Sequence, residues 1–122
     1  MPHNSHVGSL LEERAAERYG FGLGDCSYAD GRYRTTGTPV EVKATQEASD
    51  GRFRIWENDH RKLAQQNGWY VFVIYRMAGG YPKPIAMKRK KATTVTQLVN
   101  WIEAGHELKD GRQAKLPPEE IF

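Results

Sequence analysis

The stretch Trp69–Tyr75 reads Trp-Tyr-Val-Phe-Val-Ile-Tyr and is almost continuously apolar. Aromatic and β-branched residues favour strands, and a strand that lacks polar alternation is typical of one that is buried on both faces. Such a strand requires a layer of structure on each side of its sheet. We therefore expect an α/β fold in which helices flank a central strand.

The rest of the chain supplies helices and partner strands. A helix is predicted from about Ser9 to Tyr19, with Ser9 as its cap, Glu12 completing a capping box and Gly20 ending it. The other expected elements are strands within 25–35, 38–44 and 52–56, a helix over about 58–67, the strand 69–75 paired across Gly79-Gly80 with a strand over 84–88, and a helix over 93–104. The order α-β-β-β-α-β-β-α predicts a mixed β-sheet flanked by helices, with a meander of short antiparallel strands at its start.

The composition is that of one folded domain. The chain has 122 residues, 39% of them hydrophobic, which is enough for one core. We expect a single domain over 1–122, with residues 1–8 flexible and 106–122 as a C-terminal tail. Within this tail, the segment Arg112–Phe122 either packs back on the domain or makes a dimer contact. Cys26 is the only cysteine, which excludes a disulfide framework. The sequence lacks a signal-peptide core and any apolar run long enough to span a membrane, and so predicts a soluble, cytoplasmic (intracellular) protein.

The strand Thr38-Pro39-Val40-Glu41-Val42-Lys43-Ala44 carries the strongest chemical signal. Because side chains alternate along a strand, Glu41 and Lys43 share one face while the two valines take the other. A Glu-x-Lys pair on a strand is usually a solvated ion pair. Here it lies in an apolar strand, follows Asp30 by eleven positions and precedes a basic, aromatic segment. That context favours a metal-dependent nuclease site.

The chemistry of such a site accounts for each residue type. Mg²⁺ prefers oxygen ligands and keeps several waters, so Asp30 and Glu41, with the backbone carbonyl of Val42, suffice to hold Mg²⁺ or Mn²⁺ beside a substrate phosphate. Lys43 can orient the attacking water and offset the negative charge that develops at phosphorus. Asp-Gly is also a common turn dipeptide, in which case Asp25 would be the metal ligand instead of Asp30.

Basic residues suggest where a polyanion would bind. The net charge of +3 and the pI of about 9.1 favour polyanionic partners only mildly. The candidates for nucleic-acid contact are Arg32, Arg34, Arg52, Arg54, His60, Arg61, Gln65 and Lys88. His60 is expected at the surface, and the run Lys88–Lys91 is either a solvated strand end or a DNA contact. Trp56 and Trp69 are expected in the core, with base stacking as the alternative.

The motif residues and their order resemble those of a known family. Asp30 followed by Glu41-Val42-Lys43, with a Glu-bearing helix before and a helix–strand unit after, is similar to the PD-(D/E)xK nuclease superfamily over roughly Leu10–Tyr75. The resemblance implies a restriction-endonuclease-like fold, like that of archaeal Holliday-junction resolvases. It makes Asp30 and Glu41 the metal ligands and Lys43 the catalytic lysine.

The resemblance also implies two accessory residues. Glu13 would be the additional catalytic acid on the first helix, and Gln65 a polar residue on the second. The residues alone leave either Glu12 or Glu13 as a helix acid that reaches the metal or its water, with Glu13 favoured. Ala29 stands where the family often has proline. Further segments (13–19, 39–44, 51–55 and 112–117) are similar to small uncharacterised haloarchaeal or viral proteins, although such proteins are usually acidic and this chain is basic.

The function expected from these signals is Mg²⁺-dependent or Mn²⁺-dependent endonucleolytic hydrolysis of duplex or branched DNA. The activity would be structure-specific or restriction-like, and a homodimer is expected if both strands are cut. Two alternatives stay open. One is a non-catalytic nucleic-acid-binding module of the same fold, and the other is a ribonuclease that uses the same site.

Overall fold

The computed structural model describes residues 2–24, 28–48, 50–101 and 111–122, with the backbone alone for 2–5. Its elements are α1 (Pro2–Tyr19), β1 (Phe21–Leu23), β2 (Gly31–Tyr33), β3 (Pro39–Gln46), β4 (Phe53–Trp56), α2 (Glu57–Gln65), β5 (Trp69–Ala78), β6 (Tyr81–Lys91), α3 (Ala92–Thr96), β7 (Gln113–Leu116) and a 3₁₀ turn, η1 (Pro118–Glu120). Within these residues, no helix is both long and apolar enough to span a membrane.

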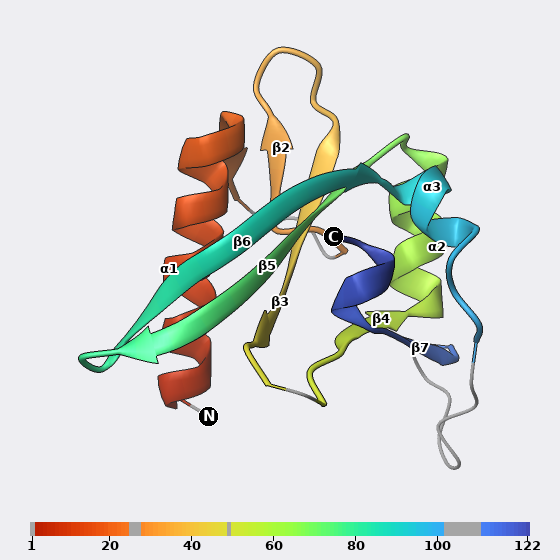
Figure 1. The fold of residues 1–122 in the computed structure, drawn as a ribbon. Coiled ribbons are helices and arrows are strands. Elements are labelled where there is room, and N and C mark those ends of the chain that lie inside the picture. The colour runs from red at the N-terminus through yellow and green to blue at the C-terminus, as the bar shows by residue number, and fades with distance from the viewer. Residues whose placement is uncertain (1, 25–27, 49, 102–110) are drawn as a thin grey trace.

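A five-stranded mixed sheet forms the centre of the molecule. Its strand order is β1-β2-β3-β5-β6, and only the β3–β5 pair is parallel. Figure 1 shows α1 on one side of the sheet and α2 with α3 on the other, while β5 and β6 extend together as a long curved ribbon. The structure confirms the expected α/β class, and the arrangement is consistent with a restriction-endonuclease-like fold.

The central strand β5 is buried on both faces, as predicted. Val71 and Val73 pack with Leu11 and Ala15 of α1 in one apolar cluster. The alternate residues, Tyr70 and Phe72, pack on the other face in a second cluster, which includes Phe53, Ile55, Leu63, Val95 and Ile121. All four β5 side chains are at most 2% exposed. Each face of the sheet therefore has its own core, and β5 contributes to both.

Segments after the central sheet close the second core. β7 pairs antiparallel with β4 to form a separate two-stranded sheet. Ile121 is buried in the second core, so the end of the chain within the described residues 111–122 packs on the domain. This placement depends on Glu57, whose carboxylate accepts hydrogen bonds from the backbone and guanidinium of Arg112 (2.8–3.1 Å) and from Arg61 (2.7 Å).

Several predicted boundaries are wrong. The first helix begins at Pro2, so Ser9 lies inside it and is not its cap. Within the described residues 28–35, the predicted strand is observed as β2, and the sequence pattern missed β1 and β7. The third helix is shorter than predicted over the described residues, and the part of the prediction beyond Trp101 lies outside them.

The chain reversal between β2 and β3 lies at Thr36–Thr38, with Gly37 at φ 73°. Asp30 therefore precedes β2 and does not shape this hairpin. Gly31 follows it at a position where a side chain is excluded, because a Cβ atom there would lie 2.3 Å from the carbonyl oxygen of Gly22. The close approach of β1 to β2 thus fixes the backbone just after Asp30.

Glu57→Gln should destabilise the protein in a pH-dependent way. Hydrogen bonds from Arg112 lower the pKa of Glu57 from 4.5 to about 2. The carboxylate therefore contributes stability above about pH 4.5, and this contribution is lost as the pH falls towards about 2. Urea unfolding of both proteins at several pH values should show a difference in unfolding free energy that is full at neutral pH and shrinks below pH 4.5.

The control is Glu47→Gln, because Glu47 forms an ion pair with Arg76 at the surface (2.8 Å). Exposed pairs contribute at most about 1 kcal/mol. A Glu57→Gln effect no larger than that of the control would contradict the anchoring role of Glu57.

Candidate active site

Asp30 is held against β3 at the point where pairing with β2 ends. Its backbone N–H donates to the carbonyl of Val40 (2.9 Å), and its Oδ2 accepts from the backbone N–H of Val42 (2.7 Å). The last paired residues of β2 and β3 are Gly31 and Val40, so the carboxylate continues the ladder by one further bond. The main chain thus fixes the position of Asp30.

The carbonyl of Val42 lies on the same edge of β3. In an extended strand the N–H and C=O of one residue point to the same side, and the N–H of Val42 points to Asp30. Glu41 and Lys43 direct their backbone groups to the other side, towards β5. The proposed backbone ligand therefore faces the Asp30 carboxylate.

Glu41 and Lys43 form an ion pair of 3.3 Å between Oε2 and Nζ, as expected from their shared face. They lie opposite Tyr70 and Phe72 of β5 in the parallel register. Their side chains are only 19% and 24% exposed, so this is not the solvated surface pair that a Glu-x-Lys sequence usually forms.

The environment of Glu41 disfavours its charge. Burial, followed by the hydrogen bond with Asp30, raises the pKa of Glu41 from 4.5 to about 9, although the Lys43 ammonium acts in the opposite direction. Two carboxyl groups that share a site cannot both ionise freely. Asp30 and Glu41 are therefore close enough to act on the same ligand.

Glu12 of α1 is a third carboxyl group at this site. Burial, the charge of Asp30 and a hydrogen bond with Asp30 raise the pKa of Glu12 to about 7. From the sequence, Glu12 completes a capping box and is the less favoured of two candidate helix acids, after Glu13. Helical spacing could have indicated its role, because Glu12 lies one turn before Ala15 and Ala16 on the side of α1 that packs on the sheet.

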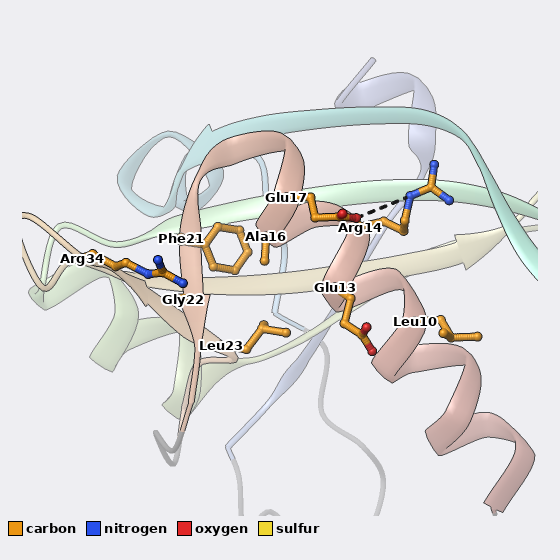
Figure 2. Close-up of a pocket in the computed structure, with 9 residues that line it drawn as sticks. All are labelled: Leu10, Glu13, Arg14, Ala16, Glu17, Phe21, Gly22, Leu23 and Arg34. Atoms are coloured by element: carbon orange, nitrogen blue, oxygen red, sulfur yellow. Dashed lines mark ion pairs between the residues drawn. The ribbon is translucent and has the colours of Figure 1, made fainter.

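Glu13, the helix acid chosen from the sequence, lies elsewhere. Figure 2 shows its side chain in a separate pocket between α1 and β1, beside Leu10 and Leu23, with Arg34 across the opening. The pocket has a volume of about 420 Å³ and does not include Asp30 or Glu41. The structure thus brings Glu12, and not Glu13, to the motif residues.

The donor set suits a hard divalent cation. Asp30, Glu41 and the Val42 carbonyl offer only oxygen, which Mg²⁺ and Mn²⁺ prefer. In the described part of the chain, no three His, Cys, Asp or Glu side chains form a complete metal-binding cluster. Mg²⁺ keeps several water ligands, so two carboxyl groups and a carbonyl suffice beside a substrate phosphate. The negative charge that the carboxyl groups can supply attracts a cation to this position. Asp25, the alternative ligand, lies outside the described residues.

His60 is buried, so the prediction of a surface histidine is wrong. It is 3% exposed, its Nδ1 lies 2.7 Å from the hydroxyl of Tyr70, and its Nε2 lies 2.7 Å from Oγ1 of Thr96. The Thr96 hydroxyl donates to the carbonyl of Ala92, so it accepts from Nε2–H, and Tyr70 donates to Nδ1. Burial lowers the pKa of His60, in agreement with a neutral ring.

This network borders the site. Tyr70 lies opposite Glu41 in the register, and the pKa of Tyr70 is raised by burial and by the charge of Glu41. His60 is therefore a core residue that supports the side of the site formed by β5.

The predicted nucleic-acid contacts are dispersed. All except His60 are exposed: Arg32, Arg34, Arg52, Arg54, Arg61, Gln65 and Lys88. Arg61 is paired with Glu57, and Arg54 lies on β4 in the second sheet. Lys88 is in the same register row as Lys43, two strands away, which corresponds to about 10 Å. Of these predicted contacts, Lys88 is therefore the one that shares a register row with a motif residue, Lys43.

A family model described as a PD-(D/E)XK nuclease superfamily domain matches residues 1–122. The chain therefore belongs to this superfamily, as the motif predicted, and membership indicates a nuclease. No curated protein and no solved structure shows significant similarity to the chain, so the resemblance to haloarchaeal or viral proteins stays a prediction.

His60→Ala should destabilise the protein by about 2–4 kcal/mol, because it opens a cavity and leaves the hydroxyl of Tyr70 without its acceptor. Urea unfolding at pH 7 measures the change. Gln65→Ala, at an exposed position of the same helix, is the control and should shift stability by at most about 0.5 kcal/mol. Equal effects of the two substitutions would contradict the buried network.

Proposed function

We propose that this member of the PD-(D/E)XK nuclease superfamily is a metal-dependent endonuclease that hydrolyses phosphodiester bonds in DNA. The observation that supports the proposal most is the convergence of Asp30, Glu41 and Lys43. One carboxylate is fixed by a backbone N–H, and the second carries the lysine partner at 3.3 Å. A Glu-x-Lys pair with no role in catalysis would normally lie at the surface, without a second carboxyl group such as Asp30 beside it.

In the proposed reaction, a water molecule attacks phosphorus in line with the 3′ oxygen. The P–O3′ bond breaks, the attacking water releases a proton to solvent, and the departing oxygen takes up a proton from solvent. Lys43 holds the attacking water and offsets the negative charge that develops on the phosphate oxygens. Its partial burial strengthens both interactions, because fewer waters screen the ammonium.

Asp30, Glu41 and the carbonyl of Val42 would hold Mg²⁺ or Mn²⁺. Bound there, the ion would supply Lewis-acid polarisation of the phosphate and a lower pKa for bound water. Glu12 acts through Asp30: its hydrogen bond sets the orientation of that carboxyl group, so Glu12 is a positioning residue and replaces Glu13 in the proposed site.

Duplex or branched DNA is the proposed substrate, cut by a homodimer if both strands are cleaved, since one site serves one strand. Exposed cations on β2 and β6, including Arg32 and Lys88, provide contacts to the phosphate backbone. A ribonuclease would use the same residues, so the cleavage assays offer RNA in parallel with DNA.

Glu41→Ala should abolish cleavage of plasmid, branched and single-stranded substrates in Mg²⁺ or Mn²⁺, because one of two carboxylate ligands is lost. Lys43→Ala should lower kcat by about 10²–10³-fold while leaving the dependence on metal concentration nearly unchanged. The measurement is gel-based cleavage, with EDTA as the metal-free control and thermal melting as the check on folding.

Activity retained by Glu41→Ala would contradict the site. Salt-sensitive DNA binding without cleavage in any metal, unaffected by Glu41→Ala, would instead support the non-catalytic module.

Adjacent residues of α1 provide a second test. Glu12→Ala should raise the Mg²⁺ concentration needed for half-maximal cleavage several-fold, because Asp30 loses a hydrogen-bond partner. Glu13→Ala, its matched neighbour, should leave that concentration unchanged. If the Glu13 variant raised the required Mg²⁺ concentration and the Glu12 variant did not, Glu13 would be the functional helix acid, as the sequence predicted.

A further inference from the structure

Arg89 of β6 is held in place by aromatic rings. Its guanidinium carbon lies 4.3 Å from the ring centroid of Trp69, 5.5 Å from that of Tyr19 and 5.8 Å from that of Tyr33. It also donates a hydrogen bond to the hydroxyl of Tyr33. The three rings come from α1, β2 and β5, so the packing of the fold itself orients this exposed side chain.

This way of holding an arginine leaves its charge available. A carboxylate partner cancels the charge of a guanidinium, whereas an aromatic face attracts it without cancelling it. Among the described residues, no carboxylate lies within ion-pair distance of Arg89, Arg18 or Lys91. Arg18 lies 5.6 Å from the ring centroid of Tyr19, and Lys91 lies 5.5 Å from that of Trp69. Three cations thus surround one group of rings.

A groove adjoins this cluster. It runs between α1 and β6 and is lined by Arg14, Glu17, Arg18, Pro84 and Met87. Glu17 lies 4.0 Å from Arg14 and offsets its charge, so Arg18 gives the groove a net positive charge. The hydroxyl of Tyr19 reaches the carbonyl of Met87 (3.5 Å), which joins the groove to the ring cluster.

We propose that Arg89, with Arg18 and Lys91, forms a preorganised binding site for the phosphodiester backbone of the nucleic-acid substrate. The inference rests on the proposed function for the identity of the ligand. A rigid, uncompensated guanidinium matches the geometry of a phosphate group, and fixed orientation reduces the entropy lost on binding. Because cations cover the rings of Trp69, Tyr19 and Tyr33, this surface binds phosphate and does not stack bases.

The register places this surface relative to the site. Arg89 lies in the row of Val71 and Val42, two strands and about 10 Å from the latter. Its side chain is on the α1 face of the sheet, whereas Glu41 and Lys43 are on the other face. The cluster therefore contacts a phosphate away from the bond that is cut and contributes to affinity for the strand that flanks it.

The test compares Arg89→Gln with Lys83→Gln. Lys83 is an exposed residue of the same strand near the Gly79-Gly80 turn, so both variants lose one positive charge. Binding to fluorescent DNA duplex and single strand is measured by anisotropy in EDTA over a series of salt concentrations. We expect Arg89→Gln to weaken binding about tenfold. It should also reduce the slope of the logarithm of affinity against the logarithm of salt concentration by about one. Lys83→Gln should change affinity by at most about twofold.

Arg89→Lys should keep the slope of the wild type because it keeps the charge, and thermal melting checks that each variant folds. If Arg89→Gln is unfolded, Arg18→Gln at the exposed end of α1 is compared with Lys83→Gln instead. Equal affinities and slopes for the Arg and Lys83 variants would overturn the inference.

Cleavage by the wild type is assayed separately. A wild type that cleaves DNA, with binding insensitive to Arg89, would overturn only this inference. A wild type that binds through Arg89 but cleaves nothing would overturn only the proposed catalysis.

Discussion

Burial of β5 on both faces is the constraint on which the candidate site depends. Because Tyr70 and Phe72 fill one face, the parallel neighbour β3 must place Glu41 and Lys43 beside apolar side chains and largely out of water. At such positions most strands carry apolar residues. The partial burial makes the electrostatic interactions of the pair strong, and it is also the reason that Glu41 resists ionisation. The same packing that stabilises the fold therefore creates the chemistry of the site.

Asp30 and Glu41 reach the site in different ways. Asp30 is fixed by a main-chain hydrogen bond at the end of a strand pair, whereas Glu41 is fixed by strand alternation and the packing of β5. A main-chain bond holds Asp30 directly and Glu12 adds a second hydrogen bond, so Asp30 is the more rigid member of the pair. Glu41 depends on Tyr70, which depends in turn on His60 and Thr96. Changes in α2 or α3 can thus reach the site through the core without touching a motif residue.

Local rules predicted some of these features and missed others. The shared face of Glu41 and Lys43 follows from strand periodicity alone, and the continuous apolar run identified β5. The choice between Glu12 and Glu13 depends on how α1 docks against the sheet, which is a tertiary property. Likewise, His60 is buried because Tyr70 and Thr96, from distant segments, satisfy both ring nitrogens. Nothing in the sequence near His60 indicates those partners.

Some arginines of this protein are held by carboxylates, and others are held by aromatic rings. Arg112, Arg61 and Arg76 are paired with carboxylates, so their charges are used within the fold and contribute little to the field outside it. Arg89 is oriented instead by rings, whose quadrupole attracts the cation without neutralising it. The net charge of +3 does not distinguish arginines paired with carboxylates from arginines held by rings, because each arginine counts as one positive charge. What determines how strongly a polyanion binds is the location of the uncompensated charges, and three of them, Arg18, Arg89 and Lys91, lie together at the rings of Tyr19 and Trp69.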